Sequence, residues 1–106
     1  MTCYFASSID GELLDAAVRQ ALPDRAWLDD SPMPSEHGND GVPIVEEFLI
    51  SLNPEFEYSD GVTALLRWTA SMHSDRSKGI YCVGPTPLVA AMRCLVANLI
   101  GEKVEL

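Results

Sequence analysis

The stretch GPTPLVAAMRCLVANLIG, residues 84–101, decides the fold. Its first four residues (GPTP) end the preceding element and start a helix, because Thr86 is a natural N-cap and Pro87 suits the first helical position. Apolar residues then recur with helical spacing and form one stripe: Leu88, Ala91, Met92, Leu95, Val96 and Leu99. Gly101 is the residue expected just beyond a helix end. The stretch therefore predicts an amphipathic C-terminal helix.

Strand patterns precede this helix. Residues 66–73 alternate between apolar and polar side chains, which predicts a half-buried strand with Trp68 on its apolar face. Residues 80–83 form a short apolar strand, and the polar residues 74–79 between the two predict a β-hairpin. Residues 48–52 and 103–106 are further candidate strands, the second at a sheet edge.

A second amphipathic helix is predicted near the N-terminus. Ser8 or Asp10 can cap it, and Pro23 ends it. Its apolar stripe comprises Leu13, Leu14, Ala17, Val18 and Ala21. The order of elements predicts a single α+β domain over residues 1–106. In it, an N-terminal helix precedes a small antiparallel sheet of two to four strands with a hairpin, and the C-terminal helix packs on that sheet.

The region between the first helix and the hairpin is less regular. Residues 25–28, around Trp27, suggest a short strand. Residues 29–40 contain two prolines and a glycine among mostly polar side chains, so we expect a mobile acidic loop at residues 29–42. Residues 43–47 suggest one helical turn that begins at Pro43, and residues 54–61 suggest a polar connection.

Charge is concentrated in the middle of the chain. The 106 residues include 16 acids and 7 bases, for a net charge of −9. Residues 24–60 hold ten of the acids and one base, so this stretch accounts for the whole net charge (10 − 1 = 9). A field of this sign repels phosphate backbones and attracts basic protein surfaces. Direct nucleic-acid binding is therefore not expected.

Composition excludes several other classes. No run of about 18 apolar residues predicts a membrane span, and residues 1–9 do not resemble a secretory signal. The chain has an odd number of cysteines without CxxC spacing: Cys3, Cys82 and Cys94. We therefore expect neither a disulfide framework nor a zinc site, but reduced thiols and a cytoplasmic location.

No motif predicts catalysis, a metal site or a cofactor. His37 and His73 stand outside any recognisable catalytic context. The acids around residues 29–40 lack the spacing of a calcium loop, and no phosphate-binding glycine loop is present. We therefore expect a protein that is not an enzyme.

Two residues of the C-terminal helix are candidates for ligand binding. Thr86 marks a helix N-terminus, where free N–H groups can hold an anion, although simple capping explains the same residue. Arg93 lies in an otherwise apolar helix and needs a carboxylate or backbone carbonyls as partners. It either forms a salt bridge that pins the helix to an acidic loop or contacts a ligand or partner.

The C-terminal block resembles the signature of the NinX-like family of phage and prophage proteins, whose biochemical function is unknown. The similarity lies in residues 84–93 (GPTPLVAAMR), Val96 and residues 101–105 (GEKVE). Weaker similarities are found in residues 14–18 (LDAAV), 34–35 (PS), 41–45 (GVPIV) and 68–70 (WTA). Ala16 and Val42 depart from the family pattern, which commonly has an aromatic residue and a glycine there. The resemblance implies a phage or prophage origin and a common fold, but no reaction.

Two functions remain open. In the first, a phage accessory protein engages a basic surface of a host protein through Trp27 and the acidic loop residues Asp29, Asp30, Glu36 and Asp40. In the alternative, Thr86 and Arg93 bind a small anionic ligand or a nucleotide. Exposed strands of a small sheet also offer a route to a homodimer.

Overall fold

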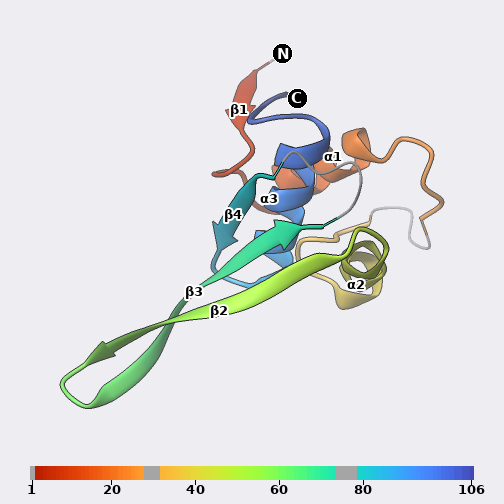
Figure 1. Cartoon of the computed structure of the whole chain (residues 1–106). Helices are drawn as coiled ribbons and strands as arrows, with labels where there is room; N and C mark the ends of the chain where they lie inside the picture. Colours follow the sequence, from red (N-terminus) through yellow and green to blue (C-terminus); the bar gives the residue numbers. More distant parts are fainter. Residues whose placement is uncertain (1, 28–31, 74–78) are drawn as a thin grey trace.

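The chain, described here by a computed structural model over residues 2–27, 32–73 and 79–106, has the predicted α+β fold (Figure 1). Within these ranges two antiparallel sheets, β1–β5 and β2–β3–β4, accompany the helices. The elements are β1 (Cys3–Phe5), α1 (Gly11–Ala21), α2 (Gly38–Glu47), β2 (Ile50–Ser59), β3 (Val62–Met72), β4 (Tyr81–Gly84), α3 (Pro87–Leu99) and β5 (Lys103–Glu105).

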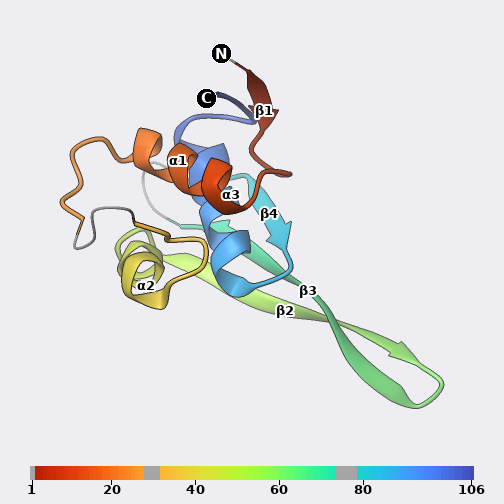
Figure 2. The ribbon, with the colours of Figure 1, turned by 180° about the vertical axis from the view of Figure 1, so that it is seen from behind.

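Helix α3 is the centre of the core. Figures 1 and 2 show it between α1 and the three-stranded sheet, with α2 beside it. Its side chains are buried without interruption from Cys94 to Asn98, so the helix is enclosed on more than the one face that its apolar stripe predicted. The largest fully buried side chains around it include Phe48, Leu14 and Ile44. The predicted packing of the C-terminal helix on the sheet is confirmed.

The helix ends follow the sequence signals. The Thr86 hydroxyl accepts a hydrogen bond from the Val89 amide at 3.2 Å, and Pro87 is the first residue of α3. Gly101 follows the C-cap Ile100 with φ of +135°. Asp10 is the N-cap of α1, which ends just before Leu22 and Pro23. One expectation for α1 is wrong, because Leu13 lies on the exposed side of the helix.

Helix α2 replaces part of the predicted acidic loop. It begins at Gly38 rather than at Pro43, so residues 38–42 are helical. The glycines suggested a chain break, but Gly41 is buried at a close approach: a Cβ there would overlap the carbonyl oxygen of Pro34 and lie 2.8 Å from Leu88 Cδ2. Tertiary packing therefore overrides the low helix propensity of glycine.

The predicted polar connection at residues 54–61 is instead part of a long hairpin. Strand β2 continues to Ser59 and pairs with β3 along its whole length. The connecting turn is Asp60-Gly61, and both residues have positive φ (51° and 77°), as a two-residue hairpin turn of the primed type requires. Pro54 is tolerated because β2 lies at the edge of its sheet.

Smaller boundaries also differ from the sequence predictions. Arg25 to Trp27 form no strand, and Leu28 lies outside the described residues. The strand predicted from Phe48 begins only at Ile50, because Phe48 caps α2 and Leu49 turns the chain with φ of +53°. The predicted strand at residues 103–106 exists as β5, and its partner β1 was not predicted. The β3–β4 pairing is confirmed, although residues 74–78 of its predicted turn lie outside the described residues.

Candidate interaction surface

The distal half of the β2–β3 hairpin projects from the body of the protein as an arm (Figures 1 and 2). We define the arm as residues 53–69. Strand β4 pairs with β3 only from Trp68 to Ser71, so the ribbon beyond Trp68 has two strands and two free edges. The arm contributes to the elongated shape of the molecule, whose principal extents are 48 × 28 × 27 Å.

One side of the arm is apolar and uncovered. Side chains alternate between the two faces of a strand, so Phe56 and Tyr58 continue the face that carries Leu52 nearer the body. Phe56 lies opposite Leu65 in the register, and a bulge between Glu55 and Phe56 leaves Leu66 as an extra residue. The exposed fractions are 59% for Phe56, 74% for Tyr58, 49% for Leu65 and 55% for Leu66.

The exposed apolar surface of the arm is as large as the largest apolar patch on a typical monomer. Aromatic side chains bury about 200 Å² each when fully covered. From their exposed fractions, Phe56 and Tyr58 therefore leave about 270 Å² open. Adding Leu65 and Leu66 brings the patch into the range of about 300–600 Å² that is found for the largest, often functional patches on monomers.

The other side of the arm is polar and held by an ion pair. Arg67 Nε donates to Glu55 Oε2 at 2.6 Å, and Thr69 Oγ1 donates to Glu55 Oε1 at 2.8 Å. The hydrogen bond from Arg67, followed by that from Thr69, lowers the pKa of Glu55 below its usual value. Glu55 therefore stays ionised, and with Glu57, Asp60 and Arg67 it gives the arm a net charge of −2 (three acids, one base).

The predicted acidic loop does not form one exposed face. Asp29 and Asp30 lie outside the described residues. Glu36 is exposed, in a turn. Asp40 is buried in α2, where its Oδ2 accepts a hydrogen bond from the Met33 amide at 3.0 Å. Asp40 thus holds residues 32–33 against α2, and its carboxylate is directed inward.

Trp27 is half-buried rather than presented as a free anchor. Its ring packs against the core, and the guanidinium of Arg25 lies 5.6 Å from the ring centroid. Arg25 in turn pairs with Glu47 at 2.8 Å. Trp27 and Asp40 do line one small hollow of about 120 Å³, so the structure brings these two predicted residues together.

The two candidate ligand-binding residues do not share a site. Thr86 lines a broad hollow of about 490 Å³ together with Ser35, Glu36 and Leu88, and the carboxylate of Glu36 there disfavours an anion. Arg93 does not line it.

Arg93 holds the fold together through backbone carbonyls. Its Nε donates to Ile9 O at 2.8 Å, and its Nη1 donates to Val83 O at 3.0 Å. Among the described residues these two carbonyls, and no acidic side chain, are its partners, so the predicted salt bridge to an acidic loop is not found there. The side chain joins α3 to β4 and to the segment before α1.

The described residues contain no cluster of three or more histidine, cysteine or acidic side chains that could hold a metal ion. No helix among them is long and apolar enough to cross a membrane. The three cysteines are free, with Cys3 exposed and both Cys82 and Cys94 buried.

Sequence reasoning missed the arm, although two signals pointed to it. Asp60-Gly61 is a strong hairpin turn signal, and Phe56 and Tyr58 alternate with Glu55 and Glu57 at the period of a strand.

Comparison with protein-family models finds no match, and comparison with curated proteins finds no similar sequence. The resemblance to the NinX-like family therefore stays a prediction.

Proposed function

We propose that this chain acts by non-catalytic binding, as a phage or prophage accessory protein whose arm docks on a basic surface of a host protein. The observation that carries the proposal is the uncovered apolar side of the arm, with Phe56 and Tyr58 at its centre. Large exposed patches with polar surroundings mark protein interaction sites, and aromatic residues are enriched at interface centres.

Charge supports the choice of a basic partner. Asp60 is exposed at the turn of the arm and Glu57 on its polar side, both within a few residues of Tyr58, and the whole chain carries a net charge of −9. A partner with lysine or arginine around an apolar depression would bury the aromatic side chains and pair with these carboxylates at the rim. Rim charges act mainly on the association rate, which falls as salt screens them.

The proposal moves the binding surface from the predicted acidic loop to the arm. Of the loop residues, Glu36 remains an exposed acid, whereas Asp40 is engaged inside the protein. Glu55, Glu57 and Asp60 belong to the same acidic stretch, residues 24–60, that suggested a basic partner. The class of partner is therefore unchanged, and different residues contact it.

The test is an affinity capture from host lysate with three forms of the tagged protein: the unchanged chain, a double variant Phe56→Ser/Tyr58→Ser, and a control Leu13→Ser. Leu13 is an exposed apolar residue on α1, away from the arm. We expect the same basic protein to be recovered with the unchanged chain and the control, at low salt only, and to be lost with the double variant. Equal recovery with the double variant, or recovery that does not depend on salt, would refute the proposal.

A control for folding accompanies the capture. Phe56 and Tyr58 are neither part of the core nor packed against it, so the double variant should keep the free energy of unfolding of the unchanged protein to within the spread of ordinary surface substitutions, about 0.5 kcal/mol. Loss of capture by a folded double variant then identifies the arm as the contact.

A further inference from the structure

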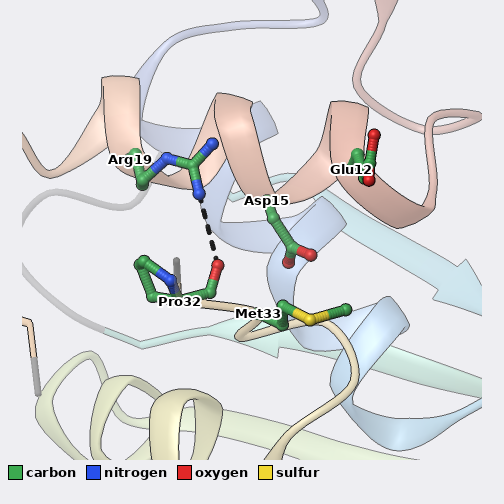
Figure 3. Close-up of a pocket in the computed structure, with 5 residues that line it drawn as sticks. All are labelled: Glu12, Asp15, Arg19, Pro32 and Met33. Carbon is green, nitrogen blue, oxygen red and sulfur yellow. Dashed lines mark hydrogen bonds between the residues drawn. The ribbon is translucent and has the colours of Figure 1, made fainter. Parts of the chain in front are cut away.

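A small pocket lies between α1 and residues 32–33, on the body of the protein and apart from the arm. Glu12, Asp15 and Arg19 of α1 line it together with Pro32 and Met33, and its volume is about 230 Å³ (Figure 3). Figure 3 shows the carboxylate of Asp15 directed from α1 towards Met33, with the guanidinium of Arg19 above Pro32. The pocket therefore places a carboxylate and a guanidinium along one wall.

Asp15 has an unused hydrogen-bond acceptor. Its side chain is buried, with a residue exposure of 2%, and its Oδ1 accepts a hydrogen bond from the Ser35 amide at 2.9 Å. Its Oδ2 is buried and has no hydrogen-bond partner among the described residues. Leaving a buried polar atom unpaired is costly, so such an atom in a native fold needs an explanation.

Arg19 does not neutralise Asp15. The two residues are four apart on one helix, a spacing that usually allows an ion pair, yet within the described part of the chain none forms between them. Instead, Arg19 Nη1 donates to Pro32 O at 3.3 Å. Within the described ranges the other donors of the guanidinium have no partner and can bind an anion, since this group presents five donors in a planar fork.

We propose that this pocket binds a free α-amino acid with a short side chain. The ammonium group of the ligand donates to Asp15 Oδ2, and its carboxylate accepts from Arg19. A molecule with a cation at one end and an anion at the other satisfies both groups at once, whereas a simple amine or a simple carboxylate satisfies only one. Glu12 adds negative charge near the ammonium end.

The size of the pocket and its remaining walls fit such a ligand. Its volume of 230 Å³ equals that of about eight liquid water molecules at roughly 30 Å³ each, which is room for a few heavy atoms. Pro32 and Met33 supply an apolar surface for a methyl or similar group. Asp15 Oδ2 is closed off from solvent, and Figure 3 places Met33 beside that carboxylate. Because a methionine side chain is flexible, it can move aside to admit the ammonium group.

The test is a titration of the isotope-labelled protein with L-alanine, followed by amide chemical shifts and by the thermal midpoint. We expect saturable shifts confined to α1 and residues 32–35, and a midpoint that rises with the logarithm of the alanine concentration once the site is filled. Ethylamine and acetate, which carry one charged end each, should give no saturable change at equal concentration. Unchanged shifts and an unchanged midpoint on adding alanine would overturn the proposal. That result is expected if a rotated Ser35 hydroxyl or a bound water alone satisfies Asp15 Oδ2.

Variants assign the two ends of the ligand. Arg19 is exposed, so Arg19→Gln should fold normally and weaken alanine binding by about tenfold or more, the effect of one charge-assisted hydrogen bond. Arg67→Gln, on the arm, is the matched control and should bind as the unchanged protein does. Asp15→Asn should abolish binding. If that variant fails to fold, Arg19→Gln decides, because undiminished binding by it refutes the zwitterion site.

Discussion

Replacing Arg93 by methionine tests the role that the structure gives to this residue. The methionine keeps most of the apolar stem of arginine and removes the guanidinium, so the packing of α3 changes little. The substitution deletes the hydrogen bonds to Ile9 O and Val83 O, which are 84 and 10 residues away in the sequence. Both carbonyls would then be left without the donor that now joins α3 to β4 and to the start of α1.

The expected loss of stability follows from these two bonds. A hydrogen bond from a charged donor contributes about 1.5–3 kcal/mol. Part of this loss of stability is offset, because the folded variant no longer has to desolvate a guanidinium. We therefore expect the free energy of unfolding to fall by about 3 kcal/mol in total. For a chain of this length that corresponds to a thermal midpoint lowered by about 10–15 °C.

The assay is urea unfolding followed by circular dichroism, with two further variants. Arg93→Lys should lie between the unchanged protein and Arg93→Met, since one ammonium group cannot replace two separated donors of a planar fork. Arg67→Met removes an arginine whose ion pair with Glu55 is exposed, and should cost at most about 1 kcal/mol. An Arg93→Met variant within about 0.5 kcal/mol of the unchanged protein would refute the structural role and return Arg93 to the list of ligand-binding candidates.

Three further predictions concern the core. Gly84→Ala should destabilise the fold by about 1–3 kcal/mol in urea titrations, because the new Cβ would lie 2.7 Å from Ala90 N. Asn98→Ala should cost about 3 kcal/mol by the same measurement, since it leaves both the N–H and the C=O of Ile80 without this partner. Burial raises the pKa of Cys94 from 9.0 to about 12, so the folded state retains a proton that the unfolded thiol releases. Stability should therefore fall between pH 9 and pH 12, with a smaller slope in Cys94→Ala, and an identical slope in that variant would contradict the assignment.

The C-terminal helix could be predicted from sequence because its signals are local. Thr86, Pro87 and Gly101 act within one turn of their own positions, and the apolar stripe repeats with the period of the helix itself. The same holds for the end of α1 at Pro23 and for the alternation along β3. In each case the residue that gives the signal also makes the contact that enforces it.

The first half of α2, residues 38–42, could not be predicted because its cause is distant in the sequence. Gly41 is required where α2 approaches the Pro34 carbonyl and Leu88 of α3, and nothing near residue 41 reveals that contact. The partners of Arg93 are hidden for the same reason: a buried arginine indicates that acceptors exist, but not that they are the carbonyls of Ile9 and Val83. Sequence reasoning thus predicted that Arg93 needs a carboxylate or backbone carbonyls as partners, but it could not say which of the two or which residues supply them.

The candidate surface escapes prediction for a different reason, because its acids are typical of a loop. Glu55 and Glu57 fall within the acidic stretch of residues 24–60, and Pro54 suggests a break in the strand. In an edge strand, neither the proline nor the acids prevent pairing with β3. The outer edge of β2 has no neighbouring strand that would need a hydrogen bond from Pro54, and the acids face solvent or Arg67.

These features also bear on how a partner docks on the arm. A free strand edge invites pairing with another chain, and proteins oppose such pairing with proline, bulges and charge along the edge. The arm has all three, in Pro54, in the bulge beside Glu55 and in the carboxylates of Glu55 and Glu57. If two copies paired edge to edge, these carboxylates would be brought together. Pro54 would also have no backbone N–H to donate to the partner strand. The carboxylates of Glu55 and Glu57 lie on the opposite face of the ribbon from Phe56 and Tyr58, so they do not oppose docking on the apolar side. We therefore expect a partner to cover that side through side chains, as α3 covers the sheet in the body, rather than to extend the sheet by another strand.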